Sequence, residues 1–226
     1  MCKKFFFTVS ILLSIPTWVL AQTSVSGRIA FEGTAPAPET VEVKSDVAAC
    51  GNVKEVKKLI LGENNGVSDA VVTLIGAQGT LQLKEGKFDQ VHCEFVPHVQ
   101  VLPVGSTLKI TSSDPVLHNS HGFNGDGSTA FNIAVPIAGM ELPTKIKQAG
   151  VIKLRCDAGH TWMSAYVVGV DHPYYAVTDG DGNFTIPNVP PGDYEIEVWH
   201  EWIGTHREPI TVKEGSQPVS IVLKKS

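Results

Sequence analysis

A cysteine, a histidine and a methionine lie close together in the segment LRCDAGHTWM, residues 154–163. Their spacing is C-x3-H-x2-M, and they are Cys156, His160 and Met163. A second histidine, His118, follows the polar turn in KITSSDPVLHNS. Thiolate, imidazole and thioether groups suit transition metals better than calcium or magnesium, which prefer oxygen ligands. The four side chains therefore predict a metal site if the fold brings His118 to this loop.

Copper fits this donor set better than other metals do. Two imidazoles and a thiolate with a weak axial methionine suit an ion that changes between Cu(I) and Cu(II). Structural zinc sites favour four Cys or His ligands. A binuclear copper site needs a second thiolate where this chain has Ile152, and the C-x-x-C-H motif of haem attachment is absent. We expect one copper ion held by His118, Cys156 and His160, with Met163 as the axial ligand.

Three further residues lie beside the expected ligands. We expect the backbone amide of Asn119 to donate a hydrogen bond to the coordinating sulfur, because such bonds tune the reduction potential. His121 is expected to be a neighbour of the site or a surface residue, although it could replace Met163 and give a distorted, less blue copper site. Trp162 is expected to pack over the loop. With it, His160 would form the outer edge through which electrons leave.

The same residues resemble the ligand motifs of the cupredoxin family. LHNSHGF, residues 117–123, resembles the H-N-x-H-x segment of amicyanins. The C-x3-H-x2-M spacing is similar to the second half of the purple copper loop of cytochrome oxidases, whereas amicyanins have one residue fewer between Cys and His. The resemblance implies a Greek-key β-sandwich, a type 1-like mononuclear copper ion, and electron transfer to redox proteins that dock transiently.

The N-terminus reads MCKKFFFTVSILLSIPTWVLA. Two lysines precede an apolar run that Pro16 interrupts, and Ala21 occupies a plausible cleavage position, which is typical of a secretory signal peptide. We expect cleavage after Ala21 and export to the periplasm or beyond. The rest of the chain has no apolar stretch approaching the roughly 18 residues of a membrane span, so we expect none in the mature protein.

The cysteine count is informative in an exported protein. Cys2 leaves with the signal peptide, so Cys50, Cys93 and Cys156 remain. In an oxidising compartment two of the three should pair, and the third needs another role. We expect a disulfide between Cys50 and Cys93, worth roughly 4 kcal/mol through its effect on the unfolded chain. Cys156 would then be the free thiol.

Nearly all of the mature chain reads as short β-strands. Residues 24–31 (SVSGRIAF) and 193–200 (DYEIEVWH) alternate between apolar and polar positions, and 69–76 (DAVVTLIG) is β-branched. VIKLRC and MSAYVVGV flank the metal loop, and the turn sequences ENNG, NGDG, DGDG and VPPGD separate strands. The pattern predicts an all-β protein built from sandwiches.

The segment AVTDGDGNFTIPNVPPGDYEIEVWHE, residues 176–201, resembles carboxypeptidase regulatory-like (transthyretin-like) β-sandwich modules. The motif is V-T-D-x-D-G-x-F-x-I-x-x-V-P-P-G-x-Y-x-I. The first strands of such a module lie far upstream, in VSGRIAFEG and GVSDAVVTLIG, so we expect a second domain inserted into it. We expect residues 40–60 to be an additional segment outside the module, held to the rest of the fold by Cys50. The expected division is a signal peptide at 1–21, a discontinuous β-sandwich at 22–81 plus 173–226, and a cupredoxin-like copper domain at 82–172.

Several functional classes are disfavoured. The formal net charge is −5 and no basic run is present, so we expect no nucleic-acid partner. No nucleophile–base pair stands out, and we expect no enzymatic activity. The expected function is that of an exported copper electron carrier. Two alternatives stay open: a copper-handling or delivery protein, and an adhesion or carbohydrate-binding β-sandwich protein.

Overall fold

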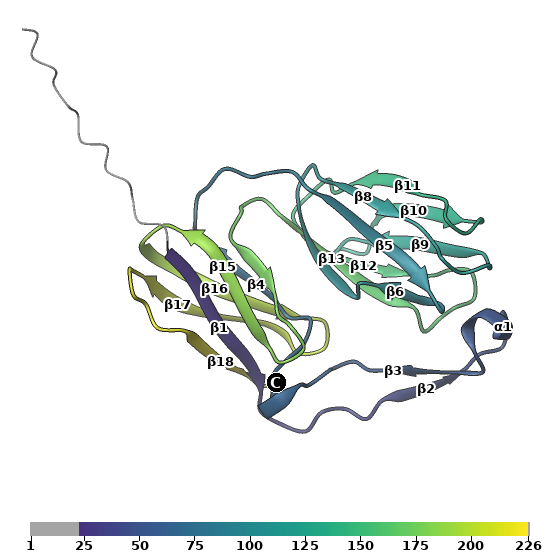
Figure 1. The fold of residues 1–226 in the computed structure, drawn as a ribbon, viewed down its shortest axis with the longest axis horizontal. Coiled ribbons are helices and arrows are strands. Elements are labelled where there is room, and N and C mark those ends of the chain that lie inside the picture. The colour runs from purple at the N-terminus through teal and green to yellow at the C-terminus, as the bar shows by residue number, and fades with distance from the viewer. Residues whose placement is uncertain (1–22, 226) are drawn as a thin grey trace, which may run out of the picture.

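The computed structural model describes residues 23–225. The expected signal peptide, residues 1–21, lies outside them. No helix within the described residues is long and apolar enough to cross a membrane. Almost all regular structure is β-strand, arranged as two β-sandwiches and a long hairpin (Figure 1), which confirms the predicted all-β fold class.

The smaller sandwich combines strands from both ends of the described chain. One sheet has the order β15-β1-β18, and the facing sheet has the order β14-β4-β16-β17. Apolar residues such as Ile29, Leu74 and Ile196 fill the space between them. The strand bounds are β1 Thr23–Phe31, β4 Val71–Ile75, β14 Tyr175–Val177, β15 Asn183–Val189, β16 Gly192–His200, β17 Gly204–Val212 and β18 Val219–Leu223.

The larger sandwich is formed by the intervening chain. Its two sheets have the orders β10-β9-β12-β13-β7 and β11-β8-β5-β6, and a second core that includes Phe88, Leu108 and Leu154 lies between them. The strand bounds are β5 Glu85–Val91, β6 Glu94–Val96, β7 Val99–Pro103, β8 Thr107–Ile110, β9 His118–Phe123, β10 Thr129–Val135, β11 Leu142–Lys145, β12 Gly150–Arg155 and β13 Ser164–Val170.

A hairpin of residues 39–56, which we call the arm, extends from the smaller sandwich to the far end of the larger one (Figure 1). It consists of β2 (Glu39–Glu42), a single helical turn α1 (Val47–Cys50) and β3 (Val53–Val56). Its two strands pair only with each other. A short 3-10 turn, η1 (Glu63–Asn65), follows.

The two sandwiches meet through a third apolar cluster. Val71 and Trp199 of the smaller sandwich pack in it with Val99 and Tyr166 of the larger one. The Tyr166 and Trp199 rings are 5.2 Å apart in an edge-on arrangement. Beside this cluster, His98 pairs with Glu201 across the junction.

Candidate metal centre

The sheet register brings the predicted donors to one end of the larger sandwich. β12 pairs with both β9 and β13, and Arg155 at its end lies opposite His121 of β9 and Ser164 of β13. The start of β9 therefore lies beside the loop that leaves β12. His118 begins β9, while the other three predicted ligands lie in or at the end of that loop.

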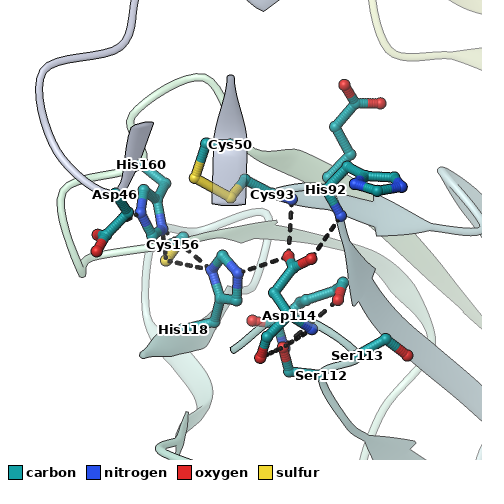
Figure 2. A network of polar contacts seen from close by, with 12 residues as sticks. Asp46, Cys50, His92, Cys93, Ser112, Ser113, Asp114, His118, Cys156 and His160 are labelled. Carbon is teal, nitrogen blue, oxygen red and sulfur yellow. Dashed lines mark hydrogen bonds and ion pairs between the residues drawn. A yellow bond between two sulfur atoms is a disulfide. The ribbon is translucent and has the colours of Figure 1, made fainter. Parts of the chain in front are cut away.

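Three donor atoms from these segments converge (Figure 2). The Nδ1 atoms of His118 and His160 are 3.0 Å apart, and the Sγ of Cys156 is 3.9 Å from the first and 3.6 Å from the second. We call these three atoms the donor triangle. Both histidines are fully buried and Cys156 is 5% exposed.

The size of the donor triangle matches metal coordination. Protein Zn–N and Zn–S bonds are about 2.0 and 2.3 Å, and bonds of that length at trigonal angles place donors roughly 3.5–3.7 Å apart. The observed separations of 3.0–3.9 Å surround that range. Two imidazoles and one thiol in a buried, near-trigonal set are the donors that copper takes in His2Cys sites. The residues present therefore fit a copper ion.

The far side of each histidine is held by a carboxylate. The Nε2 of His118 lies 2.9 Å from the Oδ2 of Asp114, and the Nε2 of His160 lies 3.1 Å from the Oδ2 of Asp46. A carboxylate that accepts the Nε2–H selects the tautomer whose Nδ1 lone pair points inward. The two aspartates thus orient the rings toward the donor triangle.

Asp114 also supports the turn between β5 and β6. Its two carboxylate oxygens accept the backbone N–H groups of His92 and Cys93, each at 2.7 Å (Figure 2). Sequence reasoning did not select Asp114, although its position four residues before His118 was a usable signal. Asp46 gave no such signal because it lies 114 positions before His160 in the sequence.

The predicted hydrogen bond to the sulfur is present. The backbone N–H of Asn119 donates to the Sγ of Cys156 at 3.4 Å. Burial raises the pKa of the Cys156 thiol, while this bond and the amides of Ala158 and His160 act in the opposite direction. The pocket alone thus favours the neutral thiol, and a bound cation would be needed to hold the thiolate. Burial also lowers the pKa of His118, which favours the neutral, metal-binding imidazole.

Met163 and Trp162 complete the end of the loop. Met163 is 2% exposed and belongs to the same apolar core as Cys156. Its backbone N–H donates to the carbonyl of His160 at 3.0 Å, which closes the turn. The Trp162 ring lies 5.3 Å from the His160 ring, and its Nε1–H donates to the carbonyl of Cys93 at 2.9 Å. Trp162 therefore packs over the loop as expected.

His121 lies on the other face of β9. Buried and half-buried residues alternate along this strand, and His118 and His121 belong to opposite sets. The Nδ1 of His121 is 2.6 Å from the Oδ2 of Asp157, and its Nε2 is 2.9 Å from the Oγ1 of Thr129. Both ring nitrogens are therefore engaged away from the donor triangle.

The predicted disulfide between Cys50 and Cys93 is confirmed, and Cys156 is the free cysteine of the described residues. The disulfide lies against the site, because both of its sulfurs are within 4.8 Å of a ring nitrogen of His160. It joins the arm to the β5–β6 turn.

His160, which we expect to be the edge through which electrons leave, is covered in the structure. The side chain has no exposed surface, because Asp46 in the arm lies against its Nε2 and Trp162 against its ring. The sequence indicated that residues 40–60 are an additional segment, but it did not show that this segment contacts the metal loop.

Comparisons with known proteins found only partial matches. Residues 157–219 match the family model described as polysaccharide lyase family 4, domain II. That segment runs from the metal loop through most of the smaller sandwich, and the match does not support the carboxypeptidase regulatory-like resemblance. No curated protein matched the sequence.

Solved structures similar to part of the chain include a cupredoxin, an amicyanin and a copper-containing nitrite reductase. A novel purple cupredoxin from Nitrosopumilus maritimus is 22% identical, with 38% of this chain and 99% of that one covered and a TM-score of 0.33. Amicyanin from Paracoccus versutus is 11% identical, with 44% and 97% covered and a TM-score of 0.34. A copper-containing nitrite reductase from Thermus scotoductus SA-01 is 19% identical, with 42% and 24% covered and a TM-score of 0.32. These similarities are weak, so we base the function on the donor triangle.

Proposed function

We propose that this protein binds a single copper ion in the donor triangle and acts as an electron carrier. The observation that carries the proposal is the convergence of two imidazole nitrogens and one sulfur, buried together at coordination spacing. When bound, copper supplies a one-electron couple. The same three donors serve both oxidation states, because imidazole accepts either and thiolate favours the reduced ion.

The protein's own residues keep the geometry fixed. Asp114 and Asp46 hold the two imidazoles, and the Asn119 amide restrains the sulfur. His118 pairs with Val135 in the sheet, and Cys156 directly follows the paired residue Arg155, so the sheet restrains the backbone at both positions. A site that does not rearrange suits rapid electron transfer, because little reorganisation accompanies the change of charge. Met163 is the proposed axial ligand.

The cellular setting follows from the same proposal. We propose that the protein is exported, that the ion is retained rather than delivered, and that redox proteins dock on it transiently. A carrier that must release its partner after each transfer needs only a small interface. A retained ion distinguishes this function from copper delivery, in which a chelator of moderate affinity should remove the metal readily.

The first prediction tests copper binding directly. Addition of Cu(II) to the copper-free mature protein should give an intense thiolate-to-copper absorption band that saturates at one equivalent. Cys156→Ser should abolish the band because the charge-transfer donor is lost. His121→Ala is the matched control, since that ring lies outside the donor triangle, and it should keep the band. Absorption and electron paramagnetic resonance spectra provide the measurement; an unchanged band in Cys156→Ser would refute the assignment.

A further inference from the structure

The arm covers the candidate metal centre. At the tip of the arm, Asp46 contacts the Nε2 of His160. The neighbouring Ser45 lies beside Gly159 of the metal loop, and the Ser45 Oγ would be 3.7 Å from a Cβ placed on Gly159. Val43 and Cys50 of the arm are buried in the same apolar core as Cys156. The tip therefore occupies the surface through which His160 would otherwise face solvent.

The stem of the arm is loosely supported. β2 and β3 pair with each other and with no strand of either sandwich. A cavity of about 460 Å³ separates β3 from the larger sandwich, and Phe95, Trp162 and Met163 line its other wall. Lys54 reaches across to Glu94 at 3.0 Å and to the carbonyl of His92. The stem could lift without breaking a sheet.

The disulfide is the strongest attachment of the tip. Cys50 ends α1, and Cys93 lies in the β5–β6 turn. The remaining tip contacts are noncovalent: a few apolar side chains and the bond from Asp46 to His160. Without the disulfide, only these weak contacts would hold the arm closed. They would have to offset the conformational entropy that the arm loses when it closes.

We propose that the Cys50–Cys93 disulfide is a latch that keeps the arm closed over His160, so that the metal centre is accessible before the latch forms and is sealed afterwards. This inference rests on the proposed function for its copper-related consequences. The latch forms when the two thiols exchange with the disulfide of an oxidised carrier protein. The S–S bond between Cys50 and Cys93 forms, the carrier's S–S bond breaks, and the carrier leaves as a dithiol with the two protons and two electrons.

The latch sets the order in which copper entry and disulfide formation take place. Both cysteines are buried in the closed form, at 4% and 0% exposed, so a reductant has little access once the latch has formed. Copper must therefore enter before the thiols are oxidised if loading is to be fast. A partner that takes electrons from the latched protein would meet the arm rather than His160 itself.

The latch can be tested in the copper-free protein. The comparison is between the wild-type mature chain and the double variant Cys50→Ser/Cys93→Ser. Carbethoxylation of His160 by diethyl pyrocarbonate, followed by peptide mass spectrometry, should be at least about tenfold faster in the double variant, because the disulfide restrains a long loop. His118 is the internal control: it is held by Asp114 outside the arm, so its modification rate should stay low in both proteins. Hydrogen exchange of residues 39–56 should rise in parallel.

A second measurement uses the metal. Cu(II) binding, followed by its absorption band, should be faster in the double variant, and loss of Cu(I) to a chelator should also be faster. Ser45→Ala keeps the latch and Asp46, and it should change both rates by less than about threefold, since it alters only an exposed side chain at the tip of the arm. If the double variant does not fold, wild-type protein that has been reduced in denaturant and refolded anaerobically with both thiols free replaces it in the labelling experiment.

The outcomes separate the two proposals. Equal labelling of His160 in latched and unlatched protein, with no added exchange in the arm, would overturn the latch. Faster labelling in a protein that forms no copper band would support the latch and contradict the proposed function. Copper rates that are the same in both proteins, although both bind the ion, would also overturn the latch.

Discussion

Each predicted metal ligand is a residue whose chemistry depends on its immediate neighbours. Burial of the Cys156 thiol opposes ionisation, and three backbone amides partly offset that effect. His118 and His160 point their Nδ1 atoms inward because Asp114 and Asp46 accept the Nε2–H groups. The two aspartates therefore matter as much to the geometry as the ligands do, although neither belongs to a ligand motif.

Met163 provides a prediction at the residue scale. Met163→Leu should keep the thiolate band, because the three strong donors remain, and should raise the reduction potential, because a donor to the oxidised ion is lost. Protein-film voltammetry and absorption spectra give the two readouts. Met140→Leu is the control, since Met140 packs at the edge of the same core. A lower potential, or loss of copper binding, would show that the role of Met163 has been misjudged.

At the scale of the elements, the close packing of β9 against β12 positions the metal centre. Gly122 of β9 lies opposite Leu154 of β12. A Cβ on Gly122 would stand 2.8 Å from the Phe131 ring and 3.1 Å from Ile152. The absence of a side chain at this position thus lets the core close beneath the sheet.

Gly122→Ala tests this packing. The extra methyl group should lower the free energy of unfolding by about 1–3 kcal/mol, the usual cost of overpacking a core. Chemical denaturation measures the change. Gly125→Ala is the control because a Cβ there meets nothing within 4 Å, and it should have little effect. Equal stability of the two variants would mean that the sheet adjusts without strain.

At the scale of the whole molecule, the junction between the sandwiches contains an ionisable pair. Burial alone would lower the pKa of His98, but the hydrogen bond and charge of Glu201 outweigh it, and the pKa is raised above its usual value of 6.5. Burial alone would raise the pKa of Glu201, but His98 outweighs that effect and lowers it below the usual 4.5. The pair is therefore most stabilising when both groups are charged.

The pH dependence follows from these directions. The contribution of His98 is complete below pH 6.5 and is lost as the pH rises through its higher folded pKa. That of Glu201 is complete above pH 4.5 and is lost as the pH falls through its lower folded pKa. Thermal unfolding should thus show His98→Gln to be most destabilising between pH 4.5 and 6.5. His206→Gln, which removes a surface pair with Glu208, should show a much smaller effect. A constant difference across pH would contradict the prediction.

Much of the candidate site could be predicted from the sequence because its signals are local. The spacing of Cys156, His160 and Met163 within one loop needs no fold to be recognised. Alternation along the strands gives the all-β class, since side chains of a strand point to opposite faces in turn. The pairing of Cys50 with Cys93 was expected from the odd cysteine count of an exported chain, which left Cys156 as the free thiol.

The contacts of the arm, in contrast, depend on tertiary structure alone. Asp46 lies 114 positions before His160, and no periodicity or spacing links a surface hairpin to a distant loop. Only the packing of the two sandwiches, together with the disulfide, determines where the tip of the arm lies. The sequence by itself thus determined which donors are present and which strands carry them. The tertiary structure decided that the histidine edge is closed, because burial is a property of surfaces that meet only after the chain has folded.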